Sequence, residues 1–326
     1  PLLFAGRFLV GLGAAVTFIG ALKIAAAWFP PGRFGLLSAI TATVGVVGGL
    51  VATAPLAGLV AWAGWRGAFW VVGGVTLACA ALCLAIVRDA PGAAARGAPS
   101  SLGAVLRGMR RVLANRHTWP PFLAFFCLYA AVGNLFLWVV PYLRDVYAVP
   151  TTRAATVAAT TSVALIVAAP LTGYVSDSIL RRRKLPYTVL CAGLLVVWAV
   201  FVATLGAVTL WAVGALLFAM GVFGGAFVLT WPIGREVNPP ELAGVAVAVT
   251  NLGGFVGAAL TQGPIGAVLD ARWAGAMAGG ARAYPVEAYR AAFAICALFV
   301  LAATALSLLL RETRGRNVWS ELADGA

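Results

Sequence analysis

The amino-acid sequence predicts an all-α polytopic membrane protein, and three observations carry that prediction. Hydrophobic residues make up 62% of the 326-residue chain and charged residues only 10%, which a water-soluble domain of this length does not normally show. Nine apolar stretches are long enough to cross roughly 30 Å of hydrocarbon as helices. None of them alternates apolar and polar residues, as the strands of a membrane β-barrel do.

The predicted spans lie unevenly on the two sides of one long hydrophilic stretch, residues 88–117. Only the first span holds a charged side chain, Lys23. The apolar run from 185 to 234 would form a helix about 75 Å long, so we expect it to fold back near Gly206. The nine spans are 8–29, 34–63, 68–87, 120–143, 154–176, 186–206, 208–233, 242–269 and 291–310.

Basic residues are concentrated in alternate connections between the spans. One set of connections carries most of the 23 lysines and arginines, and the positive-inside rule makes that side cytoplasmic. Only Lys23 and Lys184 are lysine, a bias that favours a GC-rich bacterial gene and hence the bacterial inner membrane. With nine crossings the C-terminal tail is predicted inside and Pro1 outside.

An internal repeat relates the second predicted span to the eighth. Shifting the chain by 209 residues brings nine identical residues together between 30 and 55, including a Pro-Pro pair. Chance likeness between glycine-rich helices is the alternative. A duplication predicts two parallel halves of six helices, so three helices are expected ahead of Pro1. The predicted domains are a partial N-terminal half (1–87), a linker (88–118), a six-helix half (119–310) and a tail (311–326).

The linker itself is predicted to contain an amphipathic helix between Ser101 and Asn115. Apolar residues recur there at helical spacing with arginines between them, a pattern typical of a helix on the cytoplasmic surface that meets anionic lipid. A flexible linker upstream, at 90–99, is an open alternative for the rest of this stretch. The apolar positions are Leu102, Val105, Leu106, Met109 and Leu113.

The connection between the fifth and sixth spans holds the most specific motif, G-Y-V-S-D-S-I-L-R-R-R-K. It resembles the cytoplasmic loop motif of the major facilitator superfamily, G-x-x-x-D-R/K-x-G-R-R/K-R/K, and departs from it at Ser178 and Leu180. The resemblance implies that Asp177 accepts hydrogen bonds from the exposed amides at the start of the 34–63 span and latches one conformation. An incidental Asp in a topogenic basic loop is the alternative. The matching residues are Gly173, Asp177, Arg181, Arg182 and Arg183.

The first span matches a second pattern of the same family, R-x-x-x-G-x-G, through Arg7, Gly11 and Gly13. In exporters that resemble this chain, the arginine faces the central cavity near a proton-carrying group. The alternative is that Arg7 snorkels to the outer membrane edge. The family's antiporter signature is only partly present around Pro55, where helix packing is the favoured role of the glycines.

Candidate solute contacts come from the span 120–143, where Asn134, Trp138 and Tyr142 share one helical face. The resemblance implies that this helix lines the central cavity, with Phe223 and Asn251 as weaker candidates on later helices. Tyr142 and Trp231 could instead belong to the aromatic belts at the membrane interfaces.

Together these features predict secondary active transport of a small solute by alternating access; a non-transporting relative, a sensor or a degenerate remnant is the alternative. An enzyme is not expected, because no Asp or Glu falls within the predicted spans and the one histidine, His117, lies at an edge. The five cysteines lack the spacing of a metal or redox site, so neither metal nor cofactor is expected. The expected partners are the solute, a proton or another coupling ion, and the bilayer; nucleic acid is not expected, and the protein is expected to be monomeric.

Overall fold

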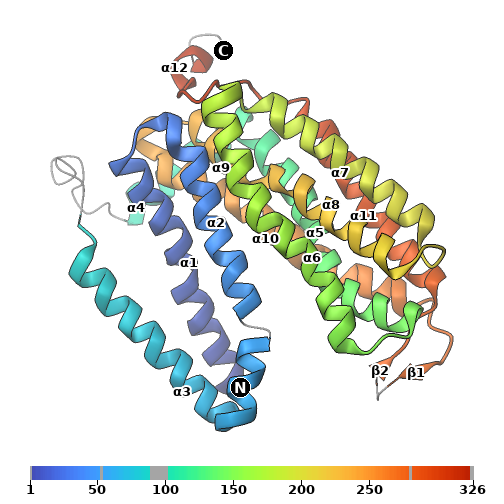
Figure 1. Ribbon diagram of the computed structural model, residues 1–326. Helices are drawn as coiled ribbons and strands as arrows, with labels where there is room; N and C mark the ends of the chain where they lie inside the picture. The colour runs from blue at the N-terminus through green and yellow to red at the C-terminus, as the bar shows by residue number, and fades with distance from the viewer. Residues whose placement is uncertain (1, 52–53, 89–101, 279–280, 324–326) are drawn as a thin grey trace.

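The structure, a computed structural model, describes residues 2–51, 54–88, 102–278 and 281–323 (Figure 1). Within these ranges nine helical segments are long and apolar enough to cross a membrane, which confirms the predicted helical bundle. The described strands are β1 (Met277–Ala278) and β2 (Ala281–Arg282), which pair as one short antiparallel hairpin. The hairpin lies at the end of the bundle opposite the C-terminus (Figure 1).

Three long helices come before the linker: α1 (Leu2–Trp28), α2 (Phe34–Val51) and α3 (Ala54–Ile86). The predicted span 34–63 covers α2 and the first part of α3, and residues 52–53 between them lie outside the described residues. The chain turns within α3 at Gly64, whose φ of 69° only glycine adopts without strain. Beyond this turn α3 is exposed and stands away from the other helices (Figure 1).

The remaining long helices form a compact bundle around a common apolar core. The predicted fold-back at Gly206 is confirmed, with φ of 75° between α7 and α8. A 3-10 turn, Gly225–Leu229, joins α8 to α9, so that these two helices make a single crossing. The helices are α5 (Trp119–Tyr147), α6 (Thr151–Tyr174), α7 (Lys184–Thr204), α8 (Leu210–Gly224), α9 (Thr230–Glu236), α10 (Ala243–Asp270) and α11 (Val286–Ser307).

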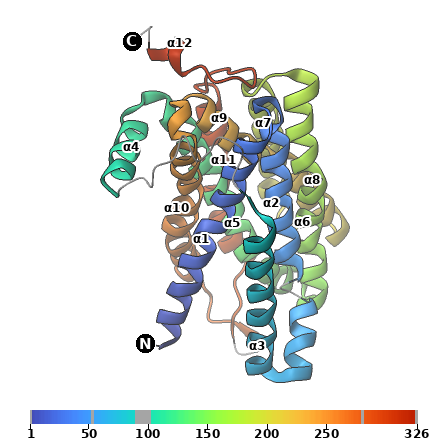
Figure 2. The ribbon, with the colours of Figure 1, turned by 90° about the vertical axis from the view of Figure 1, so that its left-hand side faces the viewer.

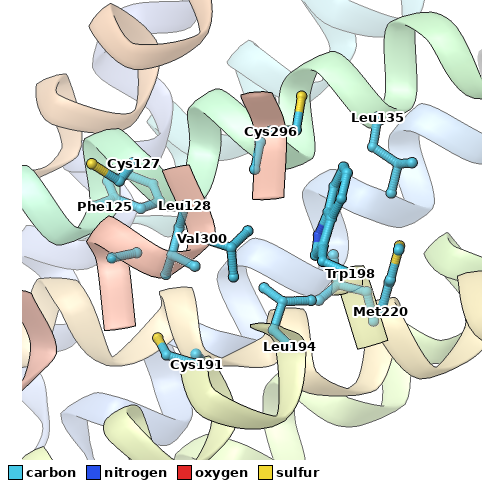
Figure 3. Close-up of a cluster of buried hydrophobic side chains, with 14 of the residues drawn as sticks. Phe125, Cys127, Leu128, Leu135, Cys191, Leu194, Trp198, Met220, Cys296 and Val300 are labelled. Carbon is cyan, nitrogen blue, oxygen red and sulfur yellow. The ribbon is translucent and has the colours of Figure 1, made fainter. Parts of the chain in front are cut away.

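Large aromatic side chains and cysteines fill the middle of this bundle (Figure 3). Trp198 is fully buried, with ring contacts to Phe201 and Phe293. Cys127, Cys191 and Cys296 are buried as free thiols, where they act as small apolar packing residues. The other two cysteines, Cys79 and Cys83, lie exposed on α3.

The 209-residue repeat is also present in the secondary structure. A 3-10 turn at Pro31–Arg33 precedes α2, and one at Pro240–Leu242 precedes α10. The offset places the first residue of α2, Phe34, on the first residue of α10, Ala243. Because turn and helix coincide to the residue, the match extends beyond glycine content to the start of each helix.

The predicted amphipathic helix is present as α4 (Leu102–Ala114). It packs on the start of α10 through Val112, which is fully buried against Ala246 and Val249. Figure 2 shows α4 beside α10, toward the end of the molecule that carries the C-terminus. Leu106 and Met109 remain exposed on α4, so an apolar strip of this helix is left for the lipid that the sequence predicts beside it.

Candidate gating site and solute contacts

The gating motif begins where α6 changes its winding. After Tyr174 the helix widens into a π-helical turn, Val175–Leu180, and the chain then leaves it through Arg181, which has φ of 48°. The family pattern places glycine at the position of Leu180, but here the left-handed residue comes one position later. A non-glycine residue in this conformation is uncommon, and it directs the next residues back toward the bundle.

Asp177 lies on this π-helical turn and points at the first turn of α2. Its Oδ2 accepts a hydrogen bond from the backbone N–H of Leu36 at 2.8 Å. The first amides of a helix have no partner within the helix, and they carry the positive end of its dipole. A buried carboxylate therefore finds both a donor and a favourable field at this position.

Two glycines make that approach possible. A Cβ atom on Gly35 would lie 2.6 Å from Oδ1 of Asp177, and one on Gly173 would lie 2.8 Å from the carbonyl oxygen of Gly35. Both distances are shorter than nonbonded carbon contacts allow. Glycine at 35 and 173 thus lets α2 and α6 meet backbone to backbone.

Arg183 holds Asp177 from the other side. The Arg183 side chain is fully buried; it pairs with Oδ1 of Asp177 and with Glu236 at the end of α9, where Nη2 lies 2.9 Å from Oε1. Nη1 also donates to Oγ of Ser176 at 3.0 Å. Burial alone would lower the pKa of Arg183, but the carboxylates of Glu236 and Asp177 raise this pKa above its ordinary value. The guanidinium is therefore charged across the whole physiological pH range.

The segment after α11 completes this network. Thr313 donates its hydroxyl to Glu236, and the backbone N–H of Val318 donates to the carbonyl oxygen of Glu236 at 2.8 Å. Glu312 accepts the backbone N–H groups of Arg183 at 2.8 Å and Lys184 at 3.2 Å, which caps the start of α7. We call Asp177, Arg183 and Glu236, with the Leu36 amide, the Asp177 latch.

Sequence reasoning found Asp177 and Arg183 but missed Glu236, Ser176, Glu312 and Thr313. A signal for Glu236 existed, because it follows Arg235 at the end of an apolar run and is an acid on the basic side of the membrane. Arg181 and Arg182, which the motif includes, are exposed. Among the described residues neither forms an ion pair, so Arg183 is the arginine of the motif that enters the latch.

The predicted solute-contact face of α5 is turned toward α10. Asn134 is fully buried, and its Nδ2 donates to Oγ1 of Thr261 on α10 at 2.9 Å. One turn later on α5, the Trp138 ring faces Gly266 of α10. A Cβ on Gly266 would lie 3.5 Å from Cζ2 of this ring. The two residues share a face, as predicted, and their contact with a solute remains a prediction.

The other candidates make separate contacts. Phe223 packs over Gly193 on α7, and Asn251 accepts a hydrogen bond from Nε1 of Trp231 at 3.0 Å. Trp231 and Tyr142 are both buried, so neither belongs to an interfacial aromatic belt in this structure. Arg7 lies in α1, and its side chain is outside the described part of the chain. Apart from the backbone of α1 itself, no atom of the described residues lies within 4 Å of the place that a Cβ on Gly11 or Gly13 would take.

Comparison with known proteins places these features in one family. The family description "Major Facilitator Superfamily" matches residues 1–262. The "Probable galactarate/D-glucarate transporter GudP" of Bacillus subtilis (strain 168) is 25% identical over 300 residues, 83% of this chain. GarP of Escherichia coli (strain K12), which carries the same description, is 25% identical over 303 residues, 82% of this chain. The chain spans 64% of the length of GudP and 67% of the length of GarP.

Two solved structures share the fold at low sequence identity. A variant of the fucose:proton symporter FucP of Escherichia coli covers 91% of this chain with a TM-score of 0.63 and 14% identity; 73% of the FucP chain is matched. FucP in the outward conformation covers 90% of this chain with a TM-score of 0.64 and 12% identity, over 72% of its own length. The family match, the relatives and the shared fold agree with the motif around Asp177, and the chain belongs to the Major Facilitator Superfamily.

Proposed function

We propose that this protein is a secondary transporter that moves a small organic solute across the membrane by alternating access, and that the Asp177 latch closes its cytoplasmic end. One observation carries the proposal: the hydrogen bond from Leu36 to Asp177 joins α2 to the bundle that α5 to α11 form. The bond lies at the predicted cytoplasmic end of both elements. A contact there opposes separation of the two helix groups at that end.

The strength of the contact suits a switch. One hydrogen bond to a charged group contributes about 1.5 to 3 kcal/mol, and the helix dipole adds up to about 1 kcal/mol. A two-state equilibrium can be reversed by a ligand with a differential affinity of this size. The Asp177–Leu36 contact is therefore firm enough to favour one state and weak enough to open in each cycle.

The two sides of the latch differ in how firmly they are held. Arg183, Glu236 and Thr313 are buried and linked to one another within the α5–α11 bundle. On the other side of the latch, α2 contributes the backbone N–H of Leu36 as the donor. When α2 withdraws, Asp177 keeps Arg183 as its partner, so no buried charge is left unpaired. This asymmetry lowers the cost of opening.

The names of the relatives make small organic anions the first solutes to test. GudP and GarP are named for galactarate and D-glucarate, and SauU of Cupriavidus necator, 27% identical over 187 residues, is named a "Probable sulfoacetate transporter". SauU covers 54% of this chain, and 44% of SauU is matched. Two cationic residues, Arg7 and Lys23, lie on α1, and ionisable residues within membrane spans typically mark substrate or ion pathways.

Counterflow in proteoliposomes tests the proposal. The complete gene product would be reconstituted and preloaded with D-glucarate, galactarate, sulfoacetate or a neutral sugar, with and without a proton gradient. We expect labelled solute to accumulate for at least one of the organic anions, and Asp177→Asn to slow that exchange while the protein still inserts. Asp270→Asn, which removes a half-exposed carboxylate paired with Arg282 near the hairpin, is the matched control. No exchange of any of these solutes by the native protein would contradict the proposal.

A further inference from the structure

A cavity of about 100 Å³ lies in the middle of the bundle, where α5, α6, α7 and α8 meet, with Val46 of α2 at its edge. Fourteen residues line it, and none of them is charged. Most of the wall is aliphatic or aromatic. Figure 3 shows one part of that wall, with the ring of Trp198 among Leu135, Leu194 and Met220.

Two polar groups in the wall lack a hydrogen-bond partner within the described structure. They are the indole Nε1 of Trp198 and the hydroxyl Oγ1 of Thr161. Trp198 is fully buried, and Thr161 is only 4% exposed. By contrast, Thr250 and Thr261 on α10 donate their hydroxyls to carbonyl oxygens one turn earlier. An unpaired buried donor costs about 1 to 3 kcal/mol, so these two groups favour an occupant that accepts from them.

We propose that this cavity binds an uncharged organic group that carries one hydrogen-bond-accepting oxygen, such as a ketone, an ether or an alcohol. The indole N–H only donates, and the threonine hydroxyl can donate or accept, so an accepting oxygen matches the hydrogen-bonding capacity of either group. A carboxylate is excluded because no cation lies in the wall to offset its desolvation. The apolar remainder of the wall contacts the carbon atoms of the group.

The volume limits the size of the occupant. An apolar cavity of about 150 Å³ admits benzene, which has six non-hydrogen atoms, so one of about 100 Å³ admits about four. The occupant is a small molecule or the end group of a larger solute. The carboxylate ends of a sugar diacid such as galactarate do not fit this chemistry. Binding in this cavity does not depend on the proposed transport.

The experiment follows the indole N–H signals of the full-length protein, labelled with ¹⁵N-tryptophan in detergent micelles. Trp198→Phe identifies the signal of Trp198. The probes are acetone, which has four non-hydrogen atoms including an acceptor oxygen, and isobutene, which has nearly the same shape without the oxygen. We expect acetone to shift the Trp198 signal downfield and saturably, whereas isobutene leaves its hydrogen-bonding shift unchanged.

Affinity is then measured by titrating acetone and following saturation transfer from the protein to its methyl signal. Trp198→Phe and Thr161→Val keep the apolar wall and remove one donor each, and each is expected to weaken binding roughly tenfold. Trp211→Phe on α8 is the matched control, because Trp211 is 87% exposed and does not line this cavity. A Trp198 indole signal that does not respond to acetone overturns the proposal. An equal loss of affinity in Trp211→Phe overturns it as well.

Discussion

The backbone N–H of Leu36 donates to Oδ2 of Asp177 at 2.8 Å, across 141 residues of sequence. This bond is the point where α2 meets the π-helical turn after α6, and Arg183 supports it from within the bundle. Because the bond joins two groups of helices, its loss should change how the molecule opens before it changes how each group folds.

Replacing Arg183 should be costly, because two carboxylates face it in a buried site. Arg183→Gln leaves Asp177 and Glu236 without a cation, and breaking a buried pair of this kind costs about 3 to 5 kcal/mol. Unfolding in detergent by increasing denaturant measures the loss. The double variant Arg183→Gln/Glu236→Gln should regain part of it, because one stranded charge is gone. Strictly additive losses would show that the two residues do not interact.

Gly173→Ala should separate α2 from α6. The added Cβ would meet the carbonyl oxygen of Gly35 and the Cα of Leu36, both at 2.8 Å, and backbone atoms cannot rotate away. We expect a loss of about 1 to 3 kcal/mol in the free energy of unfolding, typical of overpacking. Gly48→Ala on α2 is the control, since among the described residues only the local backbone of α2 lies within 4 Å of the added Cβ. Equal stability of both variants would contradict the close approach.

Val112→Asp should release α4 from the start of α10. Val112 is fully buried against Ala246 and Val249, and a carboxylate at that position has no partner to offset its desolvation. Limited trypsin digestion reports the release through faster cleavage after Arg107 and Arg110. Leu106→Asp changes a residue that is 51% exposed on the same helix, and its cleavage should match the native rate. Slow cleavage of Val112→Asp would show that α4 is held by other contacts.

Hydropathy alone predicted most of the fold, because each crossing must bury about twenty apolar residues in lipid. The turn at Gly206 followed from the length limit on one helix. The turn at Gly64 falls where the predicted span 34–63 ends, just before Arg66 interrupts the apolar run. The internal repeat, in which residues 209 positions apart are identical, agrees with the matching starts of α2 and α10.

The candidate site was predicted only where one local rule sufficed. Asp177 was placed against a helix start because exposed amides attract a carboxylate. Glu236 was missed because its partner Arg183 lies 53 residues away in the sequence. Thr313 was missed because its partner Glu236 lies 77 residues away. Helical spacing placed Asn134 and Trp138 on one face, but spacing does not say which neighbour that face meets, and the structure places α10 there.

Hydrogen–deuterium exchange at the first turn of α2 tests whether Asp177 holds this helix to the bundle. The native protein and Asp177→Asn would be compared in the peptide that contains Leu36, with Asp270→Asn as the control for loss of a carboxylate at the other end of the bundle. We expect exchange of the Leu36 amide to rise about tenfold or more in Asp177→Asn, because the charged acceptor of this amide is lost. In Asp270→Asn the exchange should stay at the native rate. Equal exchange at Leu36 in the native protein and Asp177→Asn would show that Asp177 does not hold α2 to the bundle.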